Sequence, residues 1–163
     1  MAVTEIRKDV EAARMTVVSE WDAPIERVWQ LWADPRKLER WWGPPMFPAT
    51  VVGHDLRAGG KVSYYMTGPE GEQHHGWWTV VAVDEPHRLD LVDGFADDDG
   101  SVNDDLPTTE FTVTLTALAT GGTQMSIESR FPSTEAMQQM IEMGMEAGLA
   151  AAMGQIDAIL ADE

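Results

Sequence analysis

The only long helical pattern in this chain comes last, after a series of short strand-like segments. It follows Pro132 and reads STEAMQQMIEMGMEAGLAAAMGQIDAIL. The two segments before it, EFTVTLTAL and TQMSIESRF, alternate apolar and polar residues on either side of a Gly-Gly turn, as antiparallel strands with one covered face do. A helix that follows such strands is the natural cover for their apolar face. The sequence therefore predicts a sheet that packs against its own C-terminal helix.

The segments before this unit are predicted from changes in hydrophobic period. ARMTVVSEW alternates like a strand, and DAPIERVWQLWADP then spaces its apolar residues as a short helix that ends at Pro35. A second helical turn, RKLERW, follows, and turn signals separate further strands from Phe47 onward. We expect one α+β domain over residues 1–163, with a loosely ordered N-terminal extension over residues 1–12. Its curved antiparallel sheet has about six to seven strands, and two short helices follow the first strand.

The charge and composition of the chain restrict its partners. The 28 acidic residues outnumber the 11 basic ones, and the net charge of -17 repels nucleic-acid phosphates and anionic lipid surfaces. Cysteine is absent, so disulfides and thiolate chemistry are excluded. The N-terminus has no apolar leader-like region, and no run approaches the roughly 18 apolar residues of a membrane span. We therefore expect a cytoplasmic protein with no nucleic-acid partner, no membrane contact and no cofactor.

The C-terminal helical pattern contains two contrasting rows of side chains at i, i+4 spacing. One row is long and flexible: Met137, Ile141, Met145, Leu149 and Met153. The neighbouring row has Gly144 and Gly148 at its centre. Glycine within a helix costs roughly 1 kcal/mol relative to alanine, so the pair requires a reason. Either the helix approaches the sheet closely there, or the small row leaves room for a ligand in a methionine-lined pocket.

Two pairs of adjacent tryptophans admit more than one interpretation. In LERWWGPPMFPA, glycine and prolines exclude a long helix or strand, so Trp41 and Trp42 lie either at the rim of a cavity or in the core against the short helices. Trp77 and Trp78 must point to opposite faces of a regular strand, and both faces are apolar. A sheet that is apolar on both faces suits cover by a second copy, so we include a homodimer among the expected partners.

Histidine and aspartate clusters do not match known metal-site spacings. Four histidines are present, His54, His74, His75 and His87, without an H-x-x-x-H or H-E-x-x-H pattern. In the loop ADDDGSVNDDLP, placing Gly100 at the sixth position of an EF-hand puts Phe95 at the first, which is not a calcium ligand. The loop is better interpreted as a solvated hairpin connection. We expect no metal, and neither a G-x-S-x-G elbow nor a phosphate-binding loop occurs.

Asp55 and Arg57 are candidate polar anchors. Their i, i+2 spacing on a strand projects both side chains to one face. They can form a structural ion pair beside the turn at Gly59 and Gly60, or orient a carbonyl or carboxylate in an otherwise apolar pocket.

Three motifs resemble one known superfamily. The segments WDAPIERVWQLWADPRKLERWWGP, HDLRAGGKVSYYMTGPEGEQHHGWW and MEAGLAAAMGQIDAIL are similar to the SRPBCC superfamily, which has the helix-grip or START-like fold. Within it they resemble the branch named after the activator of the heat-shock protein ATPase. The resemblance runs from about Met15 to Leu160. It implies a curved antiparallel sheet that grips a long C-terminal helix, with a cavity between them.

The resemblance and the methionine and glycine rows together suggest binding of a small apolar or aromatic ligand in that cavity. One alternative is a cyclase-like or hydrolase-like enzyme that uses the same cavity, although no residue stands out as catalytic. Another is a co-chaperone-like protein-interaction module. The residues expected to contact the ligand are Trp41, Trp42, Phe47, Tyr64, Met66, Trp77, Ile127, Met145, Gly148 and Leu149.

Overall fold

The computed structural model describes residues 3–97, 99 and 101–162. Within these residues, eight strands form one antiparallel sheet in the order β1-β2-β8-β7-β6-β5-β4-β3. The strands are β1 (Val3–Asp9), β2 (Arg14–Trp21), β3 (Ala49–His54), β4 (Lys61–Thr67), β5 (Gln73–Asp84), β6 (Arg88–Ala96), β7 (Thr109–Ala117) and β8 (Thr123–Arg130). The helices are α1 (Ile25–Ala33), α2 (Pro35–Trp41), α3 (Thr134–Glu142), α4 (Met145–Met153) and α5 (Ile156–Ala161).

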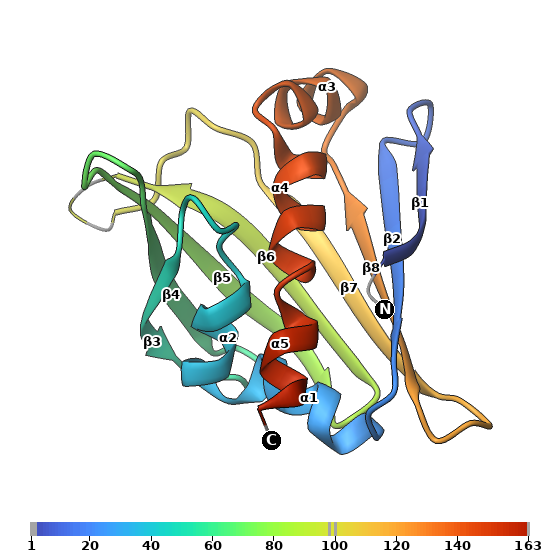
Figure 1. Ribbon diagram of the computed structural model, residues 1–163. Helices are drawn as coiled ribbons and strands as arrows, with labels where there is room; N and C mark the ends of the chain where they lie inside the picture. The colour runs from blue at the N-terminus through green and yellow to red at the C-terminus, as the bar shows by residue number, and fades with distance from the viewer. Residues whose placement is uncertain (1–2, 98, 100, 163) are drawn as a thin grey trace.

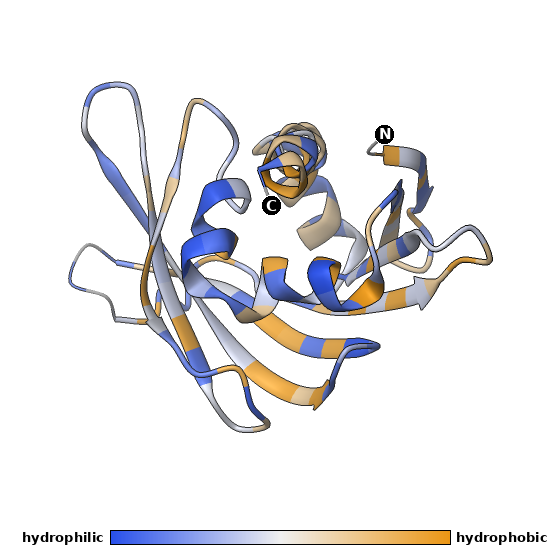
Figure 2. Cartoon of the chain, turned by 60° about the horizontal axis from the view of Figure 1, so that its bottom comes forward, coloured by the Kyte–Doolittle hydropathy of each residue, from blue (hydrophilic) through white to orange (hydrophobic). Residues whose placement is uncertain are grey.

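This architecture confirms the expected α+β helix-grip fold. The sheet is strongly curved, and the C-terminal helices run along its concave side (Figure 1). Seen nearly end-on, these helices lie inside the curve, with α1 and α2 at the near end of the molecule (Figure 2). None of the helices in the described part of the chain is long and apolar enough to cross a membrane.

The N-terminal segment differs from the expectation of a loosely ordered extension over residues 1–12. Residues from Val3 to Asp9 form β1, which pairs with β2 and brings the strand count to eight rather than six or seven. Six of these seven residues, from Thr4 to Asp9, carry largely exposed side chains. The strand therefore depends on backbone pairing, which leaves little trace in the hydrophobic pattern.

The long C-terminal helix expected from the pattern is divided. Gly144, between the C-cap residue Met143 of α3 and the first residue of α4, adopts a left-handed backbone conformation with φ of 92°. Only glycine takes such a φ readily, and it ends the i, i+4 hydrogen-bonding of the preceding helix. As a result α3 points in a different direction from α4, whereas α4 and α5 continue along one line (Figure 1). The row from Met137 to Met153 is therefore not continuous.

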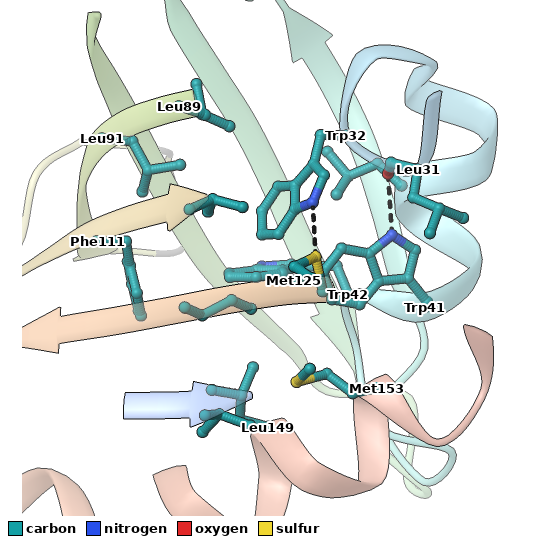
Figure 3. Close-up of a cluster of buried hydrophobic side chains, with 14 of the residues drawn as sticks. Leu31, Trp32, Trp41, Trp42, Leu89, Leu91, Phe111, Met125, Leu149 and Met153 are labelled. Carbon is teal, nitrogen blue, oxygen red and sulfur yellow. Dashed lines mark hydrogen bonds between the residues drawn. The ribbon is translucent and has the colours of Figure 1, made fainter. Parts of the chain in front are cut away.

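Four tryptophans pack together in the core: Trp32, Trp41, Trp42 and Trp78. The centroids of the Trp32 and Trp41 rings are 4.8 Å apart, and those of Trp42 and Trp78 are 4.9 Å apart, both edge to face. The indole N–H of Trp32 contacts the sulfur of Met125, and that of Trp41 donates to the carbonyl of Leu31 (Figure 3). The glycine and prolines after α2 thus hold both rings of the WW pair in the core.

The register of β5 shows which residue of the second tryptophan pair points to the inner face of the sheet. Trp78 is fully buried on the inner face with Val80, and a bulge at Val81 ends the regular alternation. Trp77 lies on the opposite face, where its indole N–H donates to the carbonyl of Phe95 at 2.9 Å. Trp77, which the sequence assigned to the ligand site, therefore lies on the face away from Trp78 and does not line the cavity described below.

Replacing Gly94 with alanine is expected to destabilise the fold by about 1–2 kcal/mol. A Cβ at this position would lie 2.3 Å from Cζ2 of Trp77, whose ring covers the glycine. Urea denaturation measures the effect, and Gly53→Ala is the matched control, because its nearest neighbours are atoms of Ser63 at 3.9 Å. Equal stability of the two variants would show that the Trp77 ring moves aside without cost.

Candidate functional site

A cavity of about 250 Å³ lies between the inner face of the sheet and the junction of α3 with α4. Most of its wall is aromatic, aliphatic or methionine. The lining residues are Trp42, Pro44, Tyr64, Met66, His74, His75, Gly76, Asp93, Phe95, Phe111, Met140, Met143, Gly144, Met145, Gly148 and Leu149. For comparison, an engineered apolar cavity of about 150 Å³ is large enough to bind benzene.

The floor of the cavity is built across three neighbouring strands. Tyr64 on β4 pairs with Gly76 on β5, and Gly76 pairs with Phe95 on β6. A Cβ on Gly76 would lie 2.5 Å from the end of the Tyr64 ring, so the missing side chain gives that ring its place across β5. The Tyr64 hydroxyl thereby reaches β6 and donates a hydrogen bond of 2.8 Å to Oδ1 of Asp93.

The helical wall surrounds the break at Gly144. Methionines flank the break, and Gly148 lies one turn further along α4. A Cβ on Gly148 would meet no atom within 4 Å. Close approach of helix and sheet therefore does not explain this glycine, which borders open space. Gln155 fixes the opposite wall, because its side chain donates to the carbonyl of Gly43 at 2.7 Å, next to Trp42.

The Tyr64–Asp93 pair is the polar feature of this floor. Burial raises the pKa of Asp93 to about 7, and the Tyr64 hydroxyl offsets part of that rise. The indole N–H of Trp78 also lowers the pKa from nearby, although it does not reach hydrogen-bond geometry. Burial, followed by the charge of Asp93, raises the pKa of the Tyr64 hydroxyl well above its usual value. Asp93 as a residue is half-buried, and it lines the cavity.

A wider cleft of about 640 Å³ adjoins the cavity at its edge. The two spaces share His74, His75, Phe95 and Met143. The cleft continues along the loop after β6, where Asp97 and Asp99 line it. The carboxylate of Asp99 accepts hydrogen bonds from the backbone and hydroxyl of Ser101, which hold its pKa below the usual range. The approach to the cavity is therefore acidic.

The sequence-predicted ligand residues fall into two groups. Those that line the cavity are Trp42, Tyr64, Met66, Met145, Gly148 and Leu149. Those that do not line it are Trp41, Phe47, Trp77 and Ile127. Trp41 and Ile127 belong to the fully packed core. Phe47 instead packs beside His74, with ring centroids 5.8 Å apart.

The two candidate polar anchors, Asp55 and Arg57, do not line the cavity. Asp55 and Arg57 are exposed and pair with each other at 2.9 Å, away from the cavity lining. Their pairing beside the Gly59–Gly60 turn fits the structural interpretation. The polar group inside the cavity is Asp93, which shares the inner face of β6 with Leu89 and Leu91. An acidic residue in an otherwise apolar alternating row is the signal that could have identified it.

Metal-binding groups do not cluster in the described residues, where no three His, Asp or Glu side chains are placed to hold an ion. His54 is used structurally, with its Nε2 2.9 Å from the carbonyl oxygen of Trp32. Two residues of the acidic loop that entered the calcium hypothesis, Asp98 and Gly100, lie outside the described residues.

Comparison with known proteins points to one family. The family model described as Activator of Hsp90 ATPase homolog 1-like protein matches residues 22–161. Protein Ms6760 from Mycobacterium smegmatis is 48% identical, with a TM-score of 0.89, and the match covers 97% of this chain and 96% of that one. A protein from Arthrobacter aurescens, solved by NMR, is 49% identical, with a TM-score of 0.94 and coverage of 99% and 93%.

A more distant structure shares the fold alone. The AHSA1 protein from Silicibacter pomeroyi is 21% identical, with a TM-score of 0.72, and the match covers 91% of this chain and 98% of that one. Among curated proteins, no match to the chain was found.

Proposed function

Because the chain belongs to the family of Activator of Hsp90 ATPase homolog 1-like proteins and has a largely apolar cavity, we propose that it binds a small apolar or aromatic ligand there. The ligand lies between the floor of β4, β5 and β6 and the wall formed by α3 and α4. Aromatic rings and methionine side chains supply most of its contacts, which suits flat, weakly polar molecules.

The open space at Gly148 is the observation that carries this proposal. Unfilled apolar space lowers the stability of a protein, and a helical glycine lowers it further. A single larger side chain at this position would remove both costs, because nothing lies within 4 Å of its Cβ site. Retaining glycine there keeps the space available, which supports a role for the cavity in binding.

A second candidate, a cyclase-like or hydrolase-like enzyme, is favoured by Asp93. A carboxyl group with a pKa of about 7 inside an apolar cavity suits proton transfer at neutral pH. Tyr64 would then orient that carboxyl group through their 2.8 Å hydrogen bond. Both candidates use the same cavity, so binding is the first property to measure.

Titration with 2-methoxynaphthalene is expected to shift the indole N–H resonances of the tryptophans around the cavity. The chain has seven tryptophans, and each contributes one indole cross-peak to a proton–nitrogen correlation spectrum. Trp42 lines the cavity, whereas Trp77 lies on the outer face of the sheet. The peak of Trp42, assigned from Trp42→Phe, should move most, and the peak of Trp77 should stay in place.

Two outcomes of this titration contradict the proposal. One is an unchanged spectrum up to the solubility limit of the probe. The other is a larger shift for Trp77 than for Trp42, which would place the probe on the outer face.

A further inference from the structure

We propose that the Tyr64–Asp93 pair selects the ligand of this cavity, favouring an aromatic molecule that carries an O–H or N–H donor and no anionic group. The inference rests on the proposed function, because it states which molecules the cavity takes. It follows from the hydrogen bonding of the pair, from the aromatic rings around it and from the charges along the approach.

Asp93 lines the cavity, and its carboxyl group has an acceptor that Tyr64 does not use. Tyr64 donates its hydroxyl proton to Oδ1. Among the described residues, no donor reaches Oδ2 in hydrogen-bond geometry. The indole N–H of Trp78 lies near the carboxyl group, but it has no hydrogen-bond partner. A carboxylate can accept several hydrogen bonds, and Asp93 is half-buried on the cavity wall. An incoming donor therefore finds a preformed acceptor at this end of the cavity.

The rings around this acceptor suit an aromatic body for the ligand. The centroid of the Trp42 ring is 6.1 Å from that of Tyr64 and 6.3 Å from that of Phe111, and both pairs are edge to face. Methionine side chains from the wall of α3 and α4 line the opposite side, and contacts of methionine sulfur with a ring edge are favourable. A flat ring bound between these walls can direct one polar substituent at Asp93.

Charge along the approach disfavours an anionic ligand. The described residues that line the cavity and the adjoining cleft include Asp93, Asp97 and Asp99 but no lysine or arginine. An anion would enter this acidic region without a compensating cation, and it would meet an acceptor rather than a donor. A neutral phenol or an aromatic amine meets neither obstacle.

Three naphthalenes with one ring system test the selection on the unaltered protein. They are 2-naphthol, which has a donor, 2-methoxynaphthalene, which has none, and 2-naphthoate, which is an anion. At about pH 8, where Asp93 is mostly ionised, 2-naphthol should bind roughly tenfold more tightly than 2-methoxynaphthalene. The affinity for 2-naphthoate should be the lowest of the three. Tryptophan resonances report each dissociation constant.

Two variants locate the source of the preference. The double variant Tyr64→Phe with Asp93→Leu removes both polar groups together, which avoids leaving one unpaired. It should lose the preference for 2-naphthol, so that its affinities for 2-naphthol and 2-methoxynaphthalene become equal. Asp93→Asn keeps the shape of the side chain but cannot ionise, so it also serves if the double variant fails to fold.

The pH dependence supplies an independent readout. The titratable groups that line the cavity are Asp93 and Tyr64 on the floor and His74 and His75 at the edge, and the wall from α3 and α4 contributes none. Affinity for 2-naphthol should rise several-fold between about pH 5.5 and pH 8, because the ionised carboxylate is the stronger acceptor. In Asp93→Asn this rise should disappear, whereas a rise caused by the histidines would remain.

The outcomes separate this inference from the proposed function. Equal affinity for 2-naphthol and 2-methoxynaphthalene overturns the selection and leaves cavity binding in place. A preference that persists in the double variant also overturns it, because the donor is then recognised elsewhere. If none of the three probes binds, the proposed function fails and the inference fails with it.

Discussion

Replacing Gly148 with leucine is expected to abolish binding of 2-methoxynaphthalene, while Gly148→Ala stabilises the protein by up to about 1 kcal/mol. The reason is the open space at this position, where a Cβ meets nothing within 4 Å. A methyl group enters that space without a clash and improves helix propensity within α4. A leucine side chain projects further and occupies the volume that the ligand needs. Urea denaturation measures stability, and the tryptophan resonances measure binding.

Gly144→Ala is the matched control, four residues earlier on the same wall. Its Cβ would also meet nothing within 4 Å, yet its φ of 92° disfavours any side chain. Alanine here should destabilise the protein by about 1–2 kcal/mol. Stabilisation by Gly148→Ala together with destabilisation by Gly144→Ala would show that the first substitution fills open space and that the second strains the backbone. A loss of stability in Gly148→Ala, or normal binding in Gly148→Leu, would contradict the cavity interpretation.

The fold was predictable where hydrophobic period and turn signals agree. The alternation in β7 and β8 and the helical period after Pro132 identify the sheet and its cover. The division of the helix at Gly144 was not predictable in the same way. A glycine at helical spacing is compatible with a continuous helix or with a break, and only the backbone φ distinguishes them. Spacing alone therefore places Gly144 and Gly148 in one row. In the structure Gly144 breaks the helix, whereas Gly148 lies within α4 and borders open space.

The candidate site was predictable only in part because it depends on contacts between strands. Trp77 and Trp78 lie in an apolar run, so the inner residue follows from the pairing of β5 with its neighbours rather than from period. The side chain of Ile127 is on the inner face of the sheet, as predicted, but it is packed in the core and does not reach the cavity. Asp93 becomes a site residue because Gly76 leaves space for Tyr64 to cross β5 and reach it. Such a relation among three strands has no signature within any one of them.

Asp93→Asn is expected to become more stable relative to the unaltered protein as the pH rises. The pKa of Asp93 is about 7 in the folded protein against an ordinary value of 3.8, so the folded state binds the proton more tightly between these values. The stabilising contribution of Asp93 is complete below the unfolded pKa and is lost as the pH rises through about 7. Asparagine does not titrate, and its side-chain oxygen can still accept the hydrogen bond from Tyr64. Between about pH 5 and pH 8.5 the variant should gain about 2 kcal/mol, a figure reduced for solvent screening because Asp93 is not fully buried.

Asp90→Asn provides the control, because Asp90 lies on the same strand and faces the other way. Burial raises the pKa of Asp90, but hydrogen bonds from Arg88 and Thr112 outweigh it and hold the pKa below its ordinary value. Its stabilising contribution is therefore lost only as the pH falls through that low pKa, below the range measured. The difference in unfolding free energy between Asp90→Asn and the unaltered protein should stay constant from about pH 5 to pH 8.5. If the difference for Asp93→Asn is equally flat, the carboxyl group of Asp93 is ionised throughout this range and behaves as an ordinary solvated acid.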